Sequence, residues 1–338
     1  MNTKQLDWLN IGLMLTALIL AKRIPFELFL FSYAVLGPLH YLTEINWLKD
    51  RTYFSKSKHI IWPMLVFAIG ISMNGILNFL ATWDTTKGMF NNWFNSDLQI
   101  WINQWNPAFV LIALCTAITI IYTKKIWIIA LSITGSVIAS YYLLQIPVTW
   151  LWIAVFTPTL VHVYIFTGLF MLYGALKNNS LPGFISVLVL VGCSFYILTS
   201  PVTNFKAPNA LTIQRFEESS FNNVIVFFRE YLGLKDITYR NINVTYVRIL
   251  SFIAFAYTYH YLNWFSKTSI IQWHKINTKK LIVLVSIWIF SVVLYYINYK
   301  LGFIVLLTLS FLHVFLEFPL NIISIREIFS DLKNRLKN

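Results

Sequence analysis

Long apolar runs separated by short polar segments follow one another along almost the whole chain. A helix needs roughly 17 to 25 predominantly apolar residues to cross the hydrocarbon core of a bilayer. The pattern therefore predicts an all-α, polytopic transmembrane helix bundle of about ten spans, in which short turns such as Lys124-Lys125 join antiparallel neighbours. The predicted spans are residues 5–20, 26–48, 60–82, 107–122, 126–144, 151–176, 184–200, 243–265, 281–299 and 301–323.

One sizeable segment, residues 201–242, lies outside the apolar runs. It contains a shorter apolar stretch, 221–234, in which Arg229 and Glu230 are embedded. This composition favours an amphipathic helix lying on the outer membrane surface, with a flexible loop as the alternative. The chain has no internal repeat and no low-complexity tract. We therefore expect a single integral membrane domain over residues 1–338, with an outer loop or amphipathic segment at 201–242.

The composition supports a membrane protein. Hydrophobic residues make up 58% of the chain and charged residues 12%, which is about half the charged fraction of a typical soluble domain. The net charge is +13, but the lysines and arginines sit in short clusters between apolar runs, which is the pattern that sets membrane orientation. Because no solvated basic domain is available to present a patch, nucleic acid is not an expected partner.

The distribution of basic residues predicts the orientation. With the N-terminus inside, the inner segments carry 16 lysines and arginines and the outer segments carry 9. This excess predicts that both termini are cytoplasmic, in a multi-pass protein of a bacterial inner membrane. The first run lacks a small-residue cleavage site, so we expect a retained span rather than a signal peptide. The expected partners are the lipid bilayer, an apolar small-molecule substrate and, as a possibility that the sequence leaves open, a second copy of the chain.

Four of the six histidines fall inside predicted spans, each in a different one. At a rise of 1.5 Å per residue, they lie about 21, 17, 26 and 18 Å from the outer edge of their spans, between the midplane and the inner third of the bilayer. Four imidazoles at similar depth can converge on one point. His59 and His274, in predicted inner loops, need no such explanation. The four histidines are His40, His162, His260 and His313.

Two carboxylates accompany these histidines. Glu44 follows His40 by four residues, and Glu317 follows His313 by four residues, so each acid shares a helix face with its histidine. Carboxylates in hydrocarbon are costly and usually face a bundle interior. Imidazole with carboxylate suits iron, zinc or manganese, and we favour Fe(II) because dioxygen and lipids both concentrate in membranes. Glu44 and Glu317 are the predicted catalytic residues, which orient ligands or relay protons.

Other interpretations stay open at this point. A single histidine within a membrane more often hydrogen-bonds a neighbouring helix than binds a metal. The same histidines and glutamates would also suit a proton- or ion-coupled transporter, a haem protein with paired axial histidines, or a membrane protein without a site. The chain has no GxxxxGK[ST] loop and no GxSxG elbow, so nucleotide-driven pumping and serine hydrolysis have no support.

Three segments resemble the Brp/Blh-type carotene-cleaving membrane dioxygenases. Residues 37–44 (GPLHYLTE) are similar to the G-x-P-H-G-x-x-D box of that family, 309–317 (LSFLHVFLE) to its last helix, and 259–267 (YHYLNWFSK) to a late histidine-containing stretch. The proline of the box is displaced by one residue, Tyr41 stands where the family has glycine, and Glu44 replaces aspartate. The resemblance implies an iron site of four histidines and a dioxygenase acting on an isoprenoid or other lipid.

Overall fold

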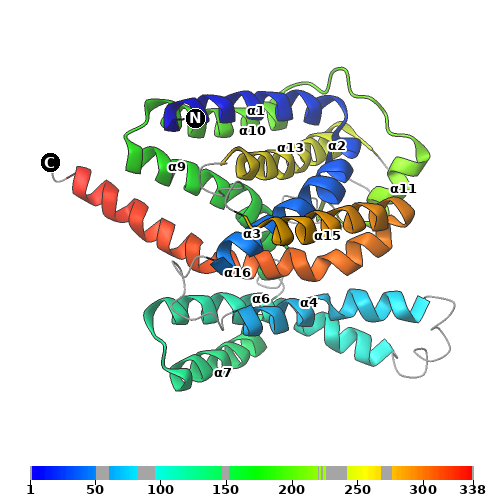
Figure 1. Ribbon diagram of the computed structural model, residues 1–338. Coiled ribbons are helices and arrows are strands. Elements are labelled where there is room, and N and C mark those ends of the chain that lie inside the picture. Colours follow the sequence, from blue (N-terminus) through cyan, green and yellow to red (C-terminus); the bar gives the residue numbers. More distant parts are fainter. Residues whose placement is uncertain are drawn as a thin grey trace. The chain divides into compact units, whose positions relative to one another are not determined.

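The computed structural model describes residues 2–50, 61–82, 96–146, 152–219, 221, 224–225, 242–267 and 276–336. In this part of the chain the regular structure is entirely helical (Figure 1), so the predicted all-α class is confirmed. The elements are α1 (Thr3–Arg23), α2 (Pro25–Phe31), the π-helix η1 (Ser32–Leu36), α3 (Gly37–Asp50), α4 (Ile61–Thr82), α6 (Ser96–Tyr122), α7 (Ile126–Leu143), the π-helix η3 (Trp152–Phe166), α9 (Thr167–Asn178), α10 (Leu181–Thr199), α11 (Ala210–Glu218), α13 (Val244–Ser266), α15 (Thr278–Ile297) and α16 (Tyr299–Arg335).

Eight stretches of helix within the described residues are long and apolar enough to cross a membrane, which makes the chain a multi-pass integral membrane protein. They are residues 25–48, 61–81, 100–122, 126–143, 157–178, 181–199 and 278–297, together with the helix of residues 299–335. The other two predicted spans, 5–20 and 243–265, are also helical and correspond to α1 and α13. The most apolar 18-residue stretch of each of these two helices is less apolar than those of the other eight.

Polar side chains of α13 are buried against α1. The amide oxygen Oδ1 of Asn10 accepts hydrogen bonds from Asn263 Nδ2 at 3.0 Å, from Ser266 Oγ at 3.2 Å and from the Tyr259 hydroxyl at 3.4 Å. All four side chains are buried. Hydrogen bonds of this kind hold membrane helices together where the hydrophobic effect between helices is absent. The polar residues that lower the hydropathy of α13 therefore attach it to its neighbour.

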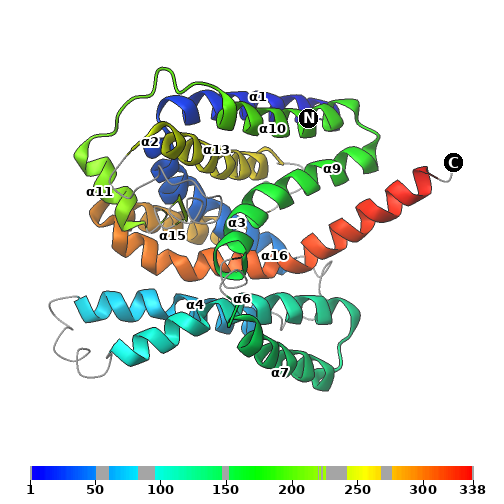
Figure 2. The ribbon, with the colours of Figure 1, turned by 180° about the vertical axis from the view of Figure 1, so that it is seen from behind.

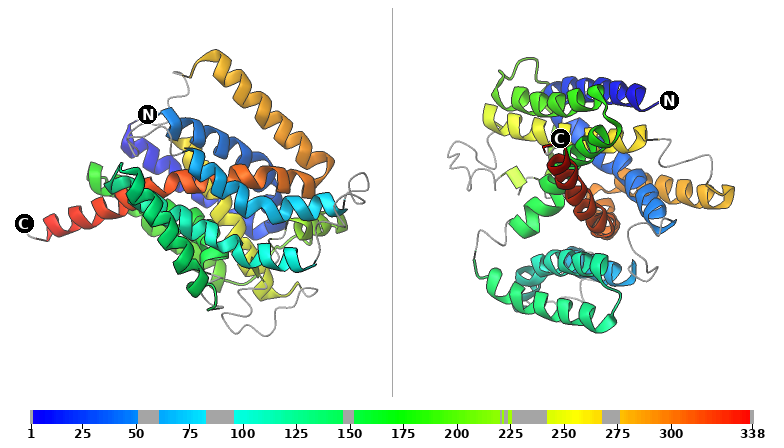
Figure 3. Two further views of the ribbon diagram at one scale, coloured as in Figure 1. Left: turned by 90° about the horizontal axis from the view of Figure 1, so that it is seen from below. Right: turned by 90° about the vertical axis from the view of Figure 1, so that its left-hand side faces the viewer.

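Contacts divide the described residues into two compact units. The first comprises segments 1–40, 163–300 and 324–338, and the second comprises 41–162 and 301–323. In the first unit α1 packs along α13 and α10, and α10 packs on α9 (Figures 1, 2 and 3). In the second unit α6 packs against α4 and α7. The single domain predicted from the sequence stays a prediction.

Aromatic side chains form the core at one end of the first unit. Phe216 of α11 makes edge-to-face contacts with Phe26 and Phe29 of α2, at centroid distances of 5.2 and 5.6 Å. Phe221 contacts Phe29 at 4.5 Å. The helix predicted at 221–234 lies mostly outside the described residues, and the short helix that the structure describes in this segment is α11, which begins after its capping residue Asn209.

Prolines lie within or beside the two π-helices. Pro158 is inside η3, and Pro38 follows η1 in the first turn of α3. A proline within a helix removes a backbone donor and clashes with the carbonyl four residues before it, which widened turns relieve. Each widened stretch lies close in sequence to a histidine, His162 in η3 and His40 in α3. The prolines therefore account for the position of both widened stretches.

Two helices extend beyond their predicted spans. Helix α6 begins at Ser96 rather than at residue 107 and contains Pro107, and Asp97 in its first turn complements the helix dipole. Helix α16 continues from the predicted end at 323 to Arg335, with Lys333 and Arg335 in its last turn. Hydropathy identifies the apolar part of a helix and does not detect such polar extensions. This is why the observed ends of α6 and α16 differ from the predicted ends.

Candidate metal centre

Two of the four histidines form a close pair in the first unit. His40 lies on α3 and His260 on α13, and their Nε2 atoms are 3.1 Å apart. Both side chains are buried, and the two rings lie edge to face at 74°. Tyr261 and Trp264 pack against the His40 ring at centroid distances of 5.1 and 5.6 Å. The two imidazoles therefore direct the same nitrogen toward each other within an aromatic surrounding.

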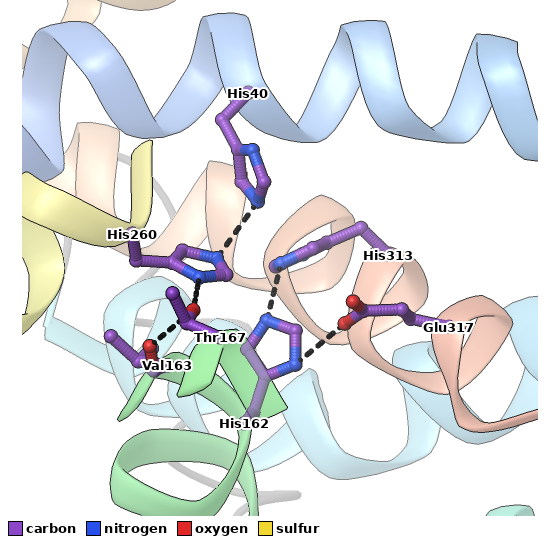
Figure 4. A network of polar contacts seen from close by, with 7 residues as sticks. All are labelled: His40, His162, Val163, Thr167, His260, His313 and Glu317. Atoms are coloured by element: carbon purple, nitrogen blue, oxygen red, sulfur yellow. Dashed lines mark hydrogen bonds and ion pairs between the residues drawn. The ribbon is translucent and has the colours of Figure 1, made fainter. Parts of the chain in front are cut away.

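The second ring nitrogen of His260 has a partner from another helix. Its Nδ1 atom lies 2.8 Å from the hydroxyl oxygen of Thr167, the first residue of α9. That hydroxyl also lies 2.8 Å from the backbone carbonyl of Val163 and donates to it. Figure 4 shows the resulting chain from the imidazole through the hydroxyl to the carbonyl. The His260 ring is thus held at Nδ1, while Nε2 faces His40.

The other two histidines form a matching pair in the second unit. His162 on η3 and His313 on α16 have their Nε2 atoms 3.1 Å apart, and both side chains are buried. The Nδ1 atom of His162 lies 2.8 Å from Oε2 of Glu317 (Figure 4). Tyr41 stacks on the His313 ring at a centroid distance of 4.4 Å. An ionised carboxylate at this distance would stabilise positive charge on the His162 ring or on a bound cation.

The four imidazoles are close together. One ligand nitrogen from each histidine lies within 4.8 Å of every other. Two nitrogens that bind one ion through bonds of about 2.1 Å are separated by at most about 4.2 Å. The 3.1 Å separation within each pair meets this limit. Four buried histidines with these spacings could bind a metal ion.

Two buried carboxyl groups accompany the histidines. Glu44 is 1% exposed and Glu317 is 4% exposed. Among the described residues no lysine or arginine is buried. A buried charge is costly unless an opposite charge accompanies it. An ionised Glu317 would therefore need a proton on the histidine pair or a bound cation, and without either it would be protonated and neutral.

The sequence predictions agree with much of this arrangement. The predicted histidines are brought together, and Glu44 is buried one turn after His40 on α3. Glu317 was expected to share a face with His313, but its described contact is with His162 on another helix. His59 and His274 lie outside the described residues.

Sequence reasoning missed Thr167. It follows His162 by five residues, a spacing without a recognised motif. A threonine in an apolar helix most often bonds to its own backbone, as Thr167 does through Val163. The contact with His260 comes from a different helix, so no local pattern could have predicted it.

The chain was compared with protein families, curated proteins and solved structures. No family model, no curated protein and no solved structure matches the chain. The fold and the site therefore define the class as an all-α, multi-pass membrane protein with a buried cluster of four histidines that could hold a metal ion.

Proposed function

We propose that the chain is a membrane-embedded non-haem iron oxidoreductase of the dioxygenase type, acting on an apolar isoprenoid or lipid. His40, His162, His260 and His313 would hold one ferrous ion. The observation that carries this proposal is the closeness of their four ligand nitrogens, within 4.8 Å of one another. Bound ferrous iron would supply the activation of dioxygen that oxidation of an unactivated apolar substrate requires.

The proposed chemistry favours iron over zinc, and the spacing within each histidine pair suits either geometry. With bonds of about 2.1 Å, neighbouring ligands lie about 3.4 Å apart on a tetrahedral ion and about 3.0 Å apart on an octahedral ion. The Nε2 atoms of each pair are 3.1 Å apart, between the two values. Structural zinc is almost always tetrahedral, whereas non-haem iron in oxygenases keeps open positions beside its protein ligands.

The surrounding side chains support an apolar substrate and an ordered ligand set. Val314, Phe315 and Phe318 adjoin His313 and Glu317 in the sequence of α16 and are buried in an apolar cluster, which is the kind of surrounding that an apolar substrate requires. Glu317, 2.8 Å from Nδ1 of His162, would orient this ligand and balance the charge of a bound cation. Glu44, buried one turn from His40, would orient ligands or relay protons at the same site.

Dioxygen consumption tests the proposal. The full chain would be purified in detergent, loaded anaerobically with Fe(II), and mixed with vesicles containing β-carotene or a membrane lipid extract. We expect iron-dependent consumption of dioxygen that is lost in His313→Ala. The matched control is His59→Ala, which removes an imidazole from a predicted loop and should retain the activity. Consumption no greater than that of His313→Ala with either vesicle preparation would overturn the proposal.

The pairing of His162 with Glu317 favours a second candidate, a proton- or ion-coupled transporter. A buried histidine and carboxylate in contact, 2.8 Å apart, beside a helix distorted at a proline is an arrangement that transporters use. This candidate predicts pH-driven flux in proteoliposomes that is lost in Glu317→Gln, and no tightly bound metal. Stoichiometric iron in the purified chain without flux would exclude it.

A further inference from the structure

The hydrogen bonds around Thr167 determine which nitrogen of His260 carries the proton. The threonine hydroxyl has one proton to donate, and the Val163 carbonyl oxygen, 2.8 Å away, can only accept it. The hydroxyl oxygen must therefore accept from its other neighbour, His260 Nδ1, also at 2.8 Å. The reverse arrangement would leave two oxygens 2.8 Å apart with no proton between them. Nδ1 of His260 thus carries hydrogen.

This assignment fixes the other side of the ring. A neutral imidazole with its proton on Nδ1 has a lone pair on Nε2. In His260 that lone pair points to Nε2 of His40, 3.1 Å away. A second lone pair at this distance would be repelled, so either a proton on His40 or a metal ion must lie between the two nitrogens. The Thr167 hydroxyl and the His260 ring are both buried, so water does not compete freely for these positions.

We propose that Thr167 is a positioning residue that holds His260 as a metal ligand through Nε2. This inference rests on the proposed metal site. The stretch from His162 to Thr167 then has two roles: it supplies one ligand directly and orients a second that belongs to α13. Figure 4 shows His162 and, five residues further along, the contact of Thr167 with His260.

The two oriented histidines differ in the group that lies beside their Nδ1 atom. His162 faces the carboxylate of Glu317 at 2.8 Å, whereas His260 faces the neutral hydroxyl of Thr167. A carboxylate acceptor raises the basicity of a ligating imidazole, and a hydroxyl fixes the orientation without adding charge. Thr167 therefore acts on the site through geometry, and a serine in its place should act in the same way.

The test compares Thr167→Val, which keeps the shape and removes the hydroxyl, with Thr167→Ser, which keeps the hydroxyl. The matched control is Thr258→Val, at a buried threonine of α13 that is bonded to Ser32 at 2.7 Å rather than to a histidine. Fe(II) affinity is measured on the full chain in detergent by competition with a chelator. We expect Thr167→Val to bind about 10- to 100-fold more weakly, and the other two variants to bind within about threefold of the unmodified chain.

A spectroscopic measurement separates positioning from a loss of fold. Nitrogen NMR of the metal-free chain, with the His260 signal identified by its absence in His260→Gln, reports which nitrogen is protonated. We expect the Nδ1-protonated form in the unmodified chain and in Thr167→Ser, and a mixture of both forms in Thr167→Val. Unchanged proton placement in Thr167→Val, or unchanged iron affinity, would overturn the inference. Failure of the unmodified chain to bind iron would instead overturn the proposed function, while the NMR comparison would still decide the role of Thr167.

Discussion

Replacing Glu317 by glutamine tests whether this carboxylate supports metal binding or only forms a structural ion pair. In the unmodified chain, Oε2 of Glu317 lies 2.8 Å from His162 Nδ1. The substitution keeps an oxygen atom near this nitrogen and removes the negative charge of the side chain. Metal binding through His162 Nε2 would place a proton on Nδ1 that can be donated to this side chain. A hydrogen bond to a charged group contributes about 1.5 to 3 kcal/mol, and a neutral one about 0.5 to 1.5 kcal/mol. The expected loss is therefore about 1 to 2 kcal/mol in metal binding, which corresponds to an affinity about 5- to 30-fold weaker.

The stability of the metal-free chain should change little. Glu317 is buried and no lysine or arginine is buried among the described residues, so removing its charge also removes a desolvation cost. We expect the free energy of unfolding without metal to fall by less than about 1 kcal/mol or to rise. The additional stability conferred by saturating metal should shrink by up to about 2 kcal/mol, following the weaker affinity.

Chelator competition and thermal unfolding in detergent, each with and without Fe(II), measure both quantities. Glu27→Gln is the matched control, since Glu27 lies in the first turn of α2 and makes no described contact with a histidine. It should leave iron affinity unchanged. A structural pair between a protonated His162 and Glu317 would behave differently, because breaking a buried ion pair costs about 3 to 5 kcal/mol. A fall of that size without metal, with unchanged iron affinity, would refute the reasoning.

Two further predictions concern the helix packing that supports the site. Asn10→Leu removes the acceptor of three hydrogen bonds from α13. It should lower the free energy of unfolding, measured by denaturation in detergent, by about 1 to 2 kcal/mol. The control Thr16→Ala changes an exposed threonine that is bonded within α1 and should have little effect. Gly70→Ala places a Cβ 2.6 Å from the Phe109 ring and should lower the free energy of unfolding by about 1 to 3 kcal/mol. The control is Gly135→Ala, where the new Cβ meets nothing within 4 Å and which should be neutral or slightly stabilising. Equal effects of the two glycine substitutions would contradict the packing described for α4 and α6.

The helices could largely be predicted from the sequence because a bilayer imposes long apolar runs. Helix α13 was predicted too, although its Tyr259, His260 and Asn263 lower its hydropathy. The length of α16 was underestimated, since its last turns carry charged residues and have no apolar signal. The wide turns of η1 and η3 could be expected only as distortions near Pro38 and Pro158, because sequence does not specify how a helix accommodates a proline.

The candidate site, like the fold, could be predicted from the sequence only in part. Four histidines at similar depth on separate helices could be singled out because each is costly in hydrocarbon. Their pairing depends on helix rotation, which no local pattern encodes. The spacing along α16 places Glu317 on the helix face of His313 but does not show that its described contact is with His162 on another helix. The role of Thr167 could not be predicted either, because its histidine partner is 93 residues away along the chain.

Metal analysis of the purified full-length chain, prepared anaerobically in detergent with Fe(II) in the growth medium, tests the central claim most directly. The account predicts about one iron atom per folded chain, and much less in His40→Ala and His313→Ala than in His274→Ala. A folded chain that retains no metal after desalting, or one whose iron content is the same in all three variants, would contradict it.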